Sequence, residues 1–166
     1  NPCVSDIDDL GISYVTVNFR INNFLRSTPC KNNIEFKYAG KTYYFDQNTG
    51  VMYQKKLFTV DGKIYYVNKY GIRVSDRWEK YDGKKYYFSP KTGRMLTGWQ
   101  TIDGEKYYLN TYGQLVKSRF VSNTYYVNEK GQRQYGWITI GEQKYYLNPS
   151  TGARAKGWKT IDGAKY

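Results

Sequence analysis

The sequence predicts an all-β fold, a β-hairpin solenoid of about six to seven tandem repeats of roughly 20 residues after a small non-repeat segment. Three observations carry this prediction: a ladder of tyrosine pairs, a ladder of large aromatic residues before the pairs, and a ladder of glycines after them. The first Tyr of successive pairs recurs at steps of 22, 21, 21, 18, 20 and 21 residues. Ladders that stay in phase over this length indicate one supersecondary unit repeated along the chain.

The ladders also predict the domain division, with residues 1–35 as a non-repeat segment and residues 36–166 as the repeat solenoid. The tyrosine pairs are Tyr43-Tyr44, Tyr65-Tyr66, Tyr86-Tyr87, Tyr107-Tyr108, Tyr125-Tyr126 and Tyr145-Tyr146, and Tyr166 begins a seventh. The large aromatic residues are Phe36, Phe58, Trp78, Trp99, Phe120, Trp137 and Trp158. The glycines are Gly50, Gly71, Gly93, Gly113, Gly131 and Gly152.

Each repeat is expected to form a hairpin around a tight turn. Asp103-Gly104 stands between two short aromatic and β-branched segments, which is a strong signal for a two-residue type I′ turn. The same signal recurs at Asp61-Gly62, Asp82-Gly83 and Asp162-Gly163, with weaker variants at Ala39-Gly40, Gly141-Glu142 and Ser122-Asn123. The repeat of Phe120 is about three residues short, which predicts an irregular hairpin there.

Alternation of side chains along a strand predicts which face of each hairpin is buried. The first Tyr of each pair shares its face with a hydrophobic residue two positions later, as in Tyr107 and Leu109, so this face is expected to be buried. The second Tyr mostly shares its face with a polar residue, as in Lys106 and Tyr108, and this face is expected to see solvent. Because a lone hairpin is marginal in water, each must bury its apolar face against the next.

The charge balance raises the question of an anionic partner, since 26 Lys and Arg against 14 Asp and Glu give a net charge of +12. The basic residues are spread at one or two per repeat, which equally fits a solvated face, and their structural period argues against nucleic acid. The sequence has no histidine, and most Asp residues are explained by turns. We therefore expect no catalysis, no metal and no cofactor in this chain. No apolar stretch is long enough to insert into a membrane.

The first 35 residues leave alternatives open. Residues 6–11 are typical of a helix end with a glycine stop, and residues 12–19 of a buried strand. This segment resembles the start of a glycosidase barrel, which would make the repeats a module of a larger hydrolase; the alternative is a short cap on the first hairpin. Cys3 and Cys30 are a candidate disulfide, which would indicate an oxidising compartment, or they stay apart.

The repeats resemble cell-wall-binding repeats, on the strength of Gly98–Asn110, Gly136–Asn148 and Gly157–Gly163. That superfamily includes choline-binding repeats, glucan-binding repeats of streptococcal glucosyltransferases and carbohydrate-binding repeats of clostridial toxins. The resemblance implies an extracellular, cell-surface or cell-wall module without catalysis, which binds a cell-wall or extracellular polysaccharide such as a glucan or teichoic-acid-type glycan. Choline is disfavoured, because the third aromatic residue that usually precedes the Tyr pair is replaced here by Thr42, Ile64, Lys85, Lys106, Thr124 and Lys144.

Candidate carbohydrate-binding residues are the second Tyr of one repeat and the Trp that opens the next. These pairs are Tyr66 with Trp78, Tyr87 with Trp99, Tyr126 with Trp137, and Tyr146 with Trp158, to which Lys106 and Tyr108 are added. A Trp at a fixed repeat position can equally be a packing anchor. Two other functions stay open: electrostatic adhesion to an anionic polymer, and a structural spacer or oligomerisation stalk that self-associates through uncapped repeat ends.

Overall fold

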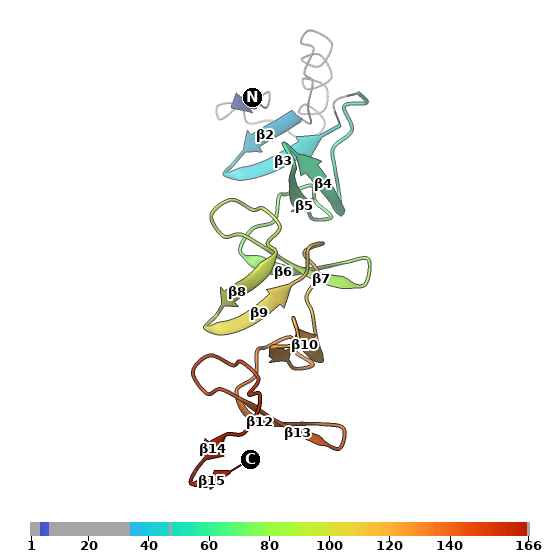
Figure 1. Ribbon diagram of the computed structural model, residues 1–166. Coiled ribbons are helices and arrows are strands. Elements are labelled where there is room, and N and C mark those ends of the chain that lie inside the picture. Colours follow the sequence, from blue (N-terminus) through green and yellow to red (C-terminus); the bar gives the residue numbers. More distant parts are fainter. Residues whose placement is uncertain (1–3, 7–33, 47, 166) are drawn as a thin grey trace. The chain divides into compact units, whose positions relative to one another are not determined.

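The structure, a computed structural model, describes residues 4–6, 34–46 and 48–165 (Figure 1). The described residues form strands and turns, and none of them lies in a helix. The strands are β1 (Val4–Asp6), β2 (Ile34–Tyr38), β3 (Lys41–Phe45), β4 (Lys56–Val60), β5 (Lys63–Val67), β6 (Arg77–Tyr81), β7 (Lys84–Phe88), β8 (Gly98–Ile102), β9 (Glu105–Leu109), β10 (Arg119–Val121), β11 (Tyr125–Val127), β12 (Gly136–Ile140), β13 (Gln143–Leu147), β14 (Thr160–Ile161) and β15 (Ala164–Lys165). The predicted all-β hairpin-repeat fold is therefore confirmed.

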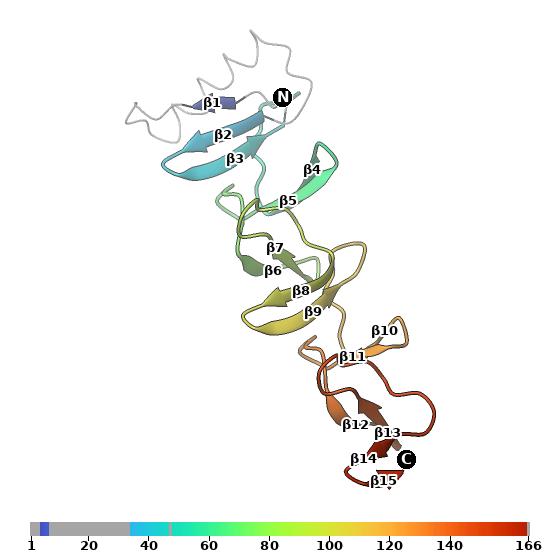
Figure 2. The ribbon, with the colours of Figure 1, turned by 60° about the vertical axis from the view of Figure 1, so that its left-hand side comes forward.

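The chain forms two compact units. The first unit comprises Asn1–Gly83 and Tyr87–Met95, and the second comprises Lys84–Tyr86 and Leu96–Tyr166. In the first unit, β1, β2 and β3 form a three-stranded sheet and β4 pairs with β5; the hairpin of β6 and β7 contains the boundary between the units. In the second unit, β8 pairs with β9, β10 with β11, β12 with β13, and β14 with β15. Figures 1 and 2 show that, within each unit, successive hairpins are turned relative to one another.

The turns explain why the sequence places Asp-Gly between the strands. Asp103 and Gly104 have φ angles of 51° and 81°, as a type I′ turn requires of both central residues. The turns at Asp61-Gly62, Asp82-Gly83, Asp162-Gly163 and Ala39-Gly40 have the same pair of positive φ angles. Of Gly141 and Glu142, only the glycine has a positive φ, 59°, which fits a type II′ turn. The predicted two-residue turns at these positions are confirmed, whereas three residues, 122–124, connect β10 and β11.

One apolar side chain per repeat fills a thin core. These side chains lie two residues after the first Tyr of each pair, and each is at most 1% exposed: Phe45, Val67, Phe88, Leu109, Val127 and Leu147. The segment that follows each hairpin folds back and bridges to this residue, as Leu115 does to Leu109 and Arg133 to Val127. The returning segment thus covers these apolar residues, whose predicted burial is confirmed, whereas the first Tyr is partly exposed in every pair except that of Tyr86.

The prediction that the second Tyr faces solvent is wrong for the first unit. Tyr44, Tyr66 and Tyr87 are only 1%, 4% and 8% exposed. The next hairpin packs on this face, since the Tyr44 ring lies 4.6 Å from that of Phe58 and the Tyr66 ring 5.9 Å from that of Phe88. A Tyr ring supplies apolar area to bury while its hydroxyl keeps a polar partner, and the Tyr44 hydroxyl donates to Glu35 Oε2 at 2.6 Å.

The glycines after the hairpins are needed for close approach as well as for positive φ. Gly131 has a φ of +85°, and a Cβ there would lie 2.8 Å from Cδ1 of Leu115. A Cβ on Gly152 would lie 2.9 Å from Nε of Arg133. In the first unit, Gly71 and Gly93 stand in the same relation to Met52 and Arg73. The side chain two residues after one loop glycine therefore lies on the loop glycine of the next repeat.

A backbone hydrogen bond fixes that same position to the preceding hairpin. The Arg133 N–H donates to the Lys106 carbonyl and the Arg154 N–H to the Thr124 carbonyl, both at 2.8 Å. In the first unit, the Arg73 N–H donates to the Thr42 carbonyl at 2.7 Å. Each repeat is thus held to its neighbour by a backbone bond and a side chain at one position, which gives the nearest-neighbour coupling expected of a repeat protein.

At the amino terminus, β1 adds to the first hairpin as a parallel partner of β2. Asp6 is the last residue of this strand, so its placement in a helix end is wrong. The candidate disulfide of Cys3 and Cys30, the predicted strand at residues 12–19 and the comparison with a glycosidase barrel fall outside the described residues. The domain division at residue 35 stays a prediction. In the described part of the chain, no helix is long and apolar enough to cross a membrane.

Candidate functional site

Aromatic rings meet at the joints between successive hairpins of the second unit. Trp99 of β8 lies 5.2 Å from Tyr108 of β9 and 5.4 Å from Tyr125 of β11, measured between ring centroids. Trp99 and Tyr108 are cross-strand partners in one hairpin, whereas Tyr125 is the first Tyr of the next pair. We call these three rings together with Arg133 the Trp99 joint.

The following joint repeats this arrangement. Phe120 of β10 lies 5.2 Å from Tyr126 across its own hairpin and 5.3 Å from Tyr145 of β13. We call these three rings together with Arg154 the Phe120 joint. In each joint, a ring that opens one hairpin contacts the second Tyr of its own hairpin and the first Tyr of the next.

An arginine lies over the rings of each joint. The guanidinium carbon of Arg133 lies 5.4 Å from the Trp99 ring and 5.1 Å from the Tyr125 and Tyr135 rings. Its Nε donates to the Tyr135 hydroxyl at 3.1 Å. The guanidinium carbon of Arg154 lies 5.2 Å from the Phe120 ring and 5.8 Å from the Tyr145 ring. These are distances at which a cation is attracted by the faces of aromatic rings.

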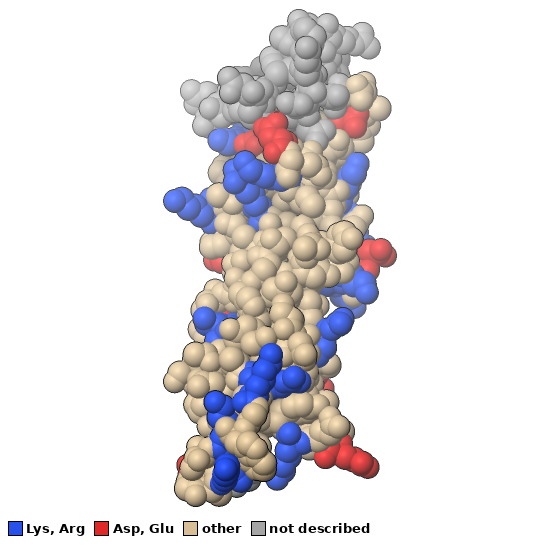
Figure 3. Space-filling view, in the orientation of Figure 1, with Lys and Arg blue, Asp and Glu red and all other residues tan. Residues whose placement is uncertain are grey.

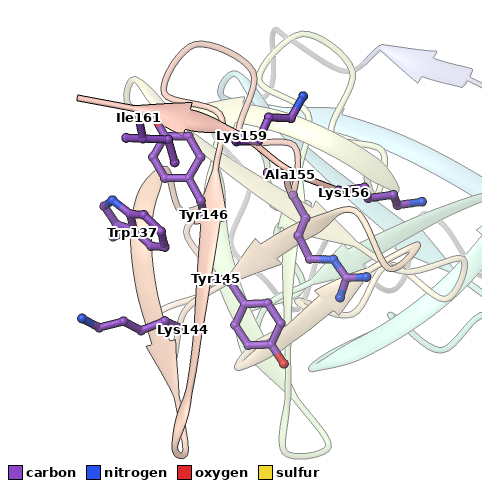
Figure 4. Close-up of a pocket in the computed structure, with 10 residues that line it drawn as sticks. Trp137, Lys144, Tyr145, Tyr146, Ala155, Lys156, Lys159 and Ile161 are labelled. Carbon is purple, nitrogen blue, oxygen red and sulfur yellow. The ribbon is translucent and has the colours of Figure 1, made fainter. Parts of the chain in front are cut away.

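A hollow of about 530 Å³ lies beside the hairpin of β12 and β13 (Figure 4). Its residues are Trp137, Lys144, Tyr145, Tyr146, Arg154, Ala155, Lys156, Gly157, Lys159 and Ile161, and we call it the Trp137 hollow. Trp137 and Tyr146 are cross-strand partners with ring centroids 5.0 Å apart, and Trp137 is 44% exposed. Figure 4 shows Lys144 on the same side of the hairpin as Trp137, with Tyr145 on the other.

The Trp137 hollow is electropositive. Four basic side chains line it, Lys144, Arg154, Lys156 and Lys159, and none of its lining residues carries a carboxylate. Figure 3 shows Lys and Arg gathered over the carboxyl-terminal hairpins. Flat rings beside several cations form a surface on which a sugar can stack while an attached anionic group is neutralised. Among the described residues, no cluster of three or more His, Cys, Asp or Glu could hold a metal ion.

The structure pairs the candidate residues differently from the sequence prediction. Three of the four Trp residues pack against the second Tyr of their own hairpin, at ring distances of 5.0 Å for Trp78 and Tyr87, 5.2 Å for Trp99 and Tyr108, and 5.0 Å for Trp137 and Tyr146. The reason is register, because with a two-residue turn a residue eight positions before the first Tyr stands opposite the second. The structure therefore brings the Trp and Tyr of one hairpin together.

The remaining candidates lie in varied surroundings. Tyr66, buried in the first unit, packs its ring on Tyr81 and Phe88. Tyr126 belongs to the Phe120 joint, and the exposed Lys106 accepts the backbone hydrogen bond of Arg133. Trp158 is 76% exposed, with the Lys165 ammonium 5.2 Å from its ring centre. That these residues bind carbohydrate stays a prediction.

The sequence prediction missed Arg133, Arg154, Tyr125 and Tyr145, which complete the joints. A signal was present, because the second residue after each loop glycine is always a long side chain: Met52, Arg73, Met95, Leu115, Arg133 and Arg154. Their contact with the next repeat appears only in three dimensions.

The predicted ladder of large aromatic residues includes Phe36 and Phe58 together with the Trp residues, but these two have a different cross-strand partner. They stand seven residues before the first Tyr and therefore opposite it, as Phe36 opposite Tyr43 and Phe58 opposite Tyr65. Glu35 and Leu57 take the place opposite the second Tyr. The hairpins of β2–β3 and β4–β5 thus lack the cross-strand aromatic partner of the second Tyr that the joints of the second unit contain.

Burial shifts the ionisation of tyrosines in the first unit. Removal from water raises the pKa of the Tyr44 phenol, and the hydrogen bond to Glu35 raises it further. Burial likewise raises the pKa of Tyr66, with a smaller contribution from Glu79. The Tyr44 hydroxyl stays protonated at neutral pH and donates its hydrogen bond to Glu35.

Known proteins share this architecture. A family model described as a cell wall binding repeat matches residues 76–95, 97–115 and 136–150. Residues 1–69, which include the first two hairpins, match a family of unknown function (DUF5722). No curated protein matches the sequence.

Solved structures with a similar fold include a choline binding protein and a modular endolysin. Choline binding protein F from Streptococcus pneumoniae, crystallised in the presence of a peptidoglycan analogue, is 29% identical with a TM-score of 0.67, over 77% of this chain and 47% of that one. A second crystal form of that protein is 35% identical with a TM-score of 0.60, over 69% and 38%. The modular Cpl-1 endolysin, complexed with a peptidoglycan analogue, is 26% identical with a TM-score of 0.50, over 75% and 37%. This chain spans less than half the length of each.

Successive hairpins with aromatic joints define a β-hairpin repeat module. The family match and the structural likeness agree on which kind it is. The repeats at residues 76–95, 97–115 and 136–150 belong to the cell wall binding repeat family.

Proposed function

We propose that this chain is a non-catalytic module that attaches the protein containing it to a cell-wall or extracellular polysaccharide at the cell surface. The observation that carries the proposal is the Trp137 hollow, which combines an exposed indole with four cations. The family membership and the peptidoglycan analogues named for the similar proteins support a cell-wall setting.

The chemistry of the hollow favours an anionic glycan. The apolar C–H face of a sugar ring can stack on Trp137 or Tyr146, which are adjacent and partly exposed. Lys144, Lys156 and Lys159 can then donate charge-assisted hydrogen bonds to a phosphate or carboxylate on the same chain. A teichoic-acid-type polymer meets both requirements, whereas a neutral glucan would use only the rings.

Retention of the protein on purified Gram-positive cell walls tests this proposal. We expect Trp137→Ala to weaken retention at least roughly tenfold, as removal of a central aromatic anchor does in other interfaces. Tyr112→Ala is the matched control, because Tyr112 is an aromatic residue of the same unit, 74% exposed and outside the hollow. Replacement of Lys144, Lys156 and Lys159 by Gln should weaken binding to intact walls more than to walls stripped of teichoic acid. Equal retention of the Trp137→Ala and Tyr112→Ala variants would refute the site.

Electrostatic adhesion is the second candidate function, and the net charge of +12 favours it. It predicts that moderate salt releases the protein, because exposed charges are screened within about 8–10 Å at physiological ionic strength. It also predicts that Trp137→Ala has no effect. A structural spacer predicts no retention under any condition, so one salt titration of the wild type and the Trp137→Ala variant separates the three functions.

A further inference from the structure

Three arginines occupy one position of the repeat and follow the same path. Arg73, Arg133 and Arg154 each lie two residues after a loop glycine and donate their backbone N–H to the preceding hairpin. The side chain of Arg133 then crosses the surface of Gly152, where only the absence of a Cβ leaves room for it. The fold therefore fixes Arg133 at its backbone, by the hydrogen bond, and along its side chain, by the contact with Gly152.

In the second unit, this path ends among aromatic rings. The guanidinium of Arg133 lies within 5.4 Å of three ring centres, those of Trp99, Tyr125 and Tyr135. Arg154 reaches two rings of the Phe120 joint in the same way. Rings gathered around one point are the arrangement by which proteins recognise quaternary ammonium groups. Here a cation of the chain itself already lies at that point.

We propose that Arg133 and Arg154 are internal occupants of these two aromatic joints and close them to quaternary ammonium ligands such as choline. A second cation in the same joint would be repelled by the guanidinium at short range, and the ring faces are already engaged. The residue two positions after the loop glycine is thus the specificity-determining position of each joint. Arg154 and Tyr145 also line the Trp137 hollow, but the Trp99 joint shares no residue with it, so the inference at Arg133 does not rest on the proposed polysaccharide binding.

Two other repeats have a neutral residue two positions after the loop glycine, namely Met95 and Leu115. Leu115 donates its backbone N–H to the Lys85 carbonyl at 2.8 Å and lies on Gly131, so it is held in the same way as Arg133. Leucine is therefore a replacement for Arg133 that the fold already accepts.

The test uses the full chain with its four tryptophans replaced biosynthetically by fluorotryptophan. Fluorine NMR then gives one resonance per Trp, and the Trp99 resonance is assigned from a Trp99→Phe variant. Choline chloride is titrated into the unaltered protein and into Arg133→Leu, with 3,3-dimethylbutanol as a neutral probe of the same shape. Arg133→Lys keeps a cation at the position, and Arg154→Leu opens the other joint only.

We expect choline to shift the Trp99 resonance saturably in Arg133→Leu, at concentrations at least roughly tenfold below the highest at which the unaltered chain still shows no shift. The resonance should stay fixed in the unaltered protein, in Arg133→Lys and in Arg154→Leu, and the neutral probe should bind more weakly than choline. A Phe120→Trp reporter extends the test to Arg154→Leu in the other joint.

Two results would overturn the inference. A saturable shift of Trp99 in the unaltered protein would show that the guanidinium leaves the joint to admit choline. A well-dispersed spectrum of Arg133→Leu that does not respond to choline would show that the arginine is not what closes the joint. If the leucine variant loses its spectral dispersion, the choline titration is repeated with Arg133→Met. The same two results would then overturn the inference.

Discussion

Some glycines contact the preceding repeat and others do not. Replacing them by alanine should therefore lower the free energy of unfolding by different amounts. Gly104 and Gly131 both lie in the second unit, with φ angles of +81° and +85°. An alanine at either position must adopt the left-handed region, which costs roughly 1–2 kcal/mol. A Cβ on Gly104 meets nothing within 4 Å, whereas a Cβ on Gly131 lies 2.8 Å from Cδ1 of Leu115.

That contact is far shorter than the optimal carbon separation of about 3.5–4.0 Å, so Leu115 would have to move. Overpacking of this kind adds about 1–3 kcal/mol. We therefore expect Gly131→Ala to lower the free energy of unfolding by about 2–5 kcal/mol and Gly104→Ala by about 1–2 kcal/mol. Urea unfolding followed by circular dichroism measures both.

A double-mutant cycle isolates the clash. Leu115→Ala removes the atoms that the new methyl group meets, so Gly131→Ala should cost less in that background by about the overpacking term. The same Leu115→Ala change should leave the cost of Gly104→Ala unaltered. Equal costs for the two glycine substitutions, with no coupling between Gly131 and Leu115, would refute the argument that repeats are held together through this contact.

Three further predictions follow from burial and exposure. Leu147→Ala should lower the free energy of unfolding by about 2–5 kcal/mol, and Thr139→Ala on the same hairpin by less than about 0.5 kcal/mol, in parallel urea titrations; similar costs would contradict a core centred on Leu147. Because the pKa of Tyr44 is raised in the folded state, its stabilising contribution is complete below about pH 10 and is lost as the pH rises further. Thermal melts from pH 9 to 12 should show this loss and should show it less in Tyr44→Phe, and a Tyr44→Phe curve parallel to the wild type would contradict it. Trp158→Ala should weaken wall retention less than Trp137→Ala, because Trp158 lies outside the hollow; equal losses would contradict a site centred on the hollow.

Short-range features of the fold could be predicted from the sequence. The turn at Asp103-Gly104 and the burial of Leu109 depend on residues within one hairpin, where alternation and turn chemistry decide the outcome. The burial of Tyr44 could not be predicted in this way, because it depends on Phe58 from the next hairpin. A polar neighbour on the strand indicates the solvent side only where no further repeat covers that face.

The pairing of Trp99 with Tyr108 could be predicted from the sequence. A spacing of eight residues with a two-residue turn places the Trp opposite the second Tyr, whereas the seven residues between Phe58 and Tyr65 place that ring opposite the first. The position of Arg133 among three rings could not be predicted from the sequence, because it depends on a backbone hydrogen bond to Lys106 in another repeat.

The Trp99 joint and the Trp137 hollow contain similar pairs of rings beside different cations, and this arrangement predicts how free choline acts. Trp137 and Tyr146 repeat the cross-strand geometry of Trp99 and Tyr108, at 5.0 Å against 5.2 Å. Arg133 lies over the rings of its joint, whereas lysines line the wall of the hollow.

Neither arrangement favours an added cation, so choline should not elute the unaltered protein from cell walls, while a soluble anionic glycan should. Elution is followed by absorbance at matched ionic strength, with sodium chloride as the control for screening. Elution by choline at concentrations where sodium chloride has no effect would place the binding energy in a quaternary ammonium site and refute attachment through the Trp137 hollow.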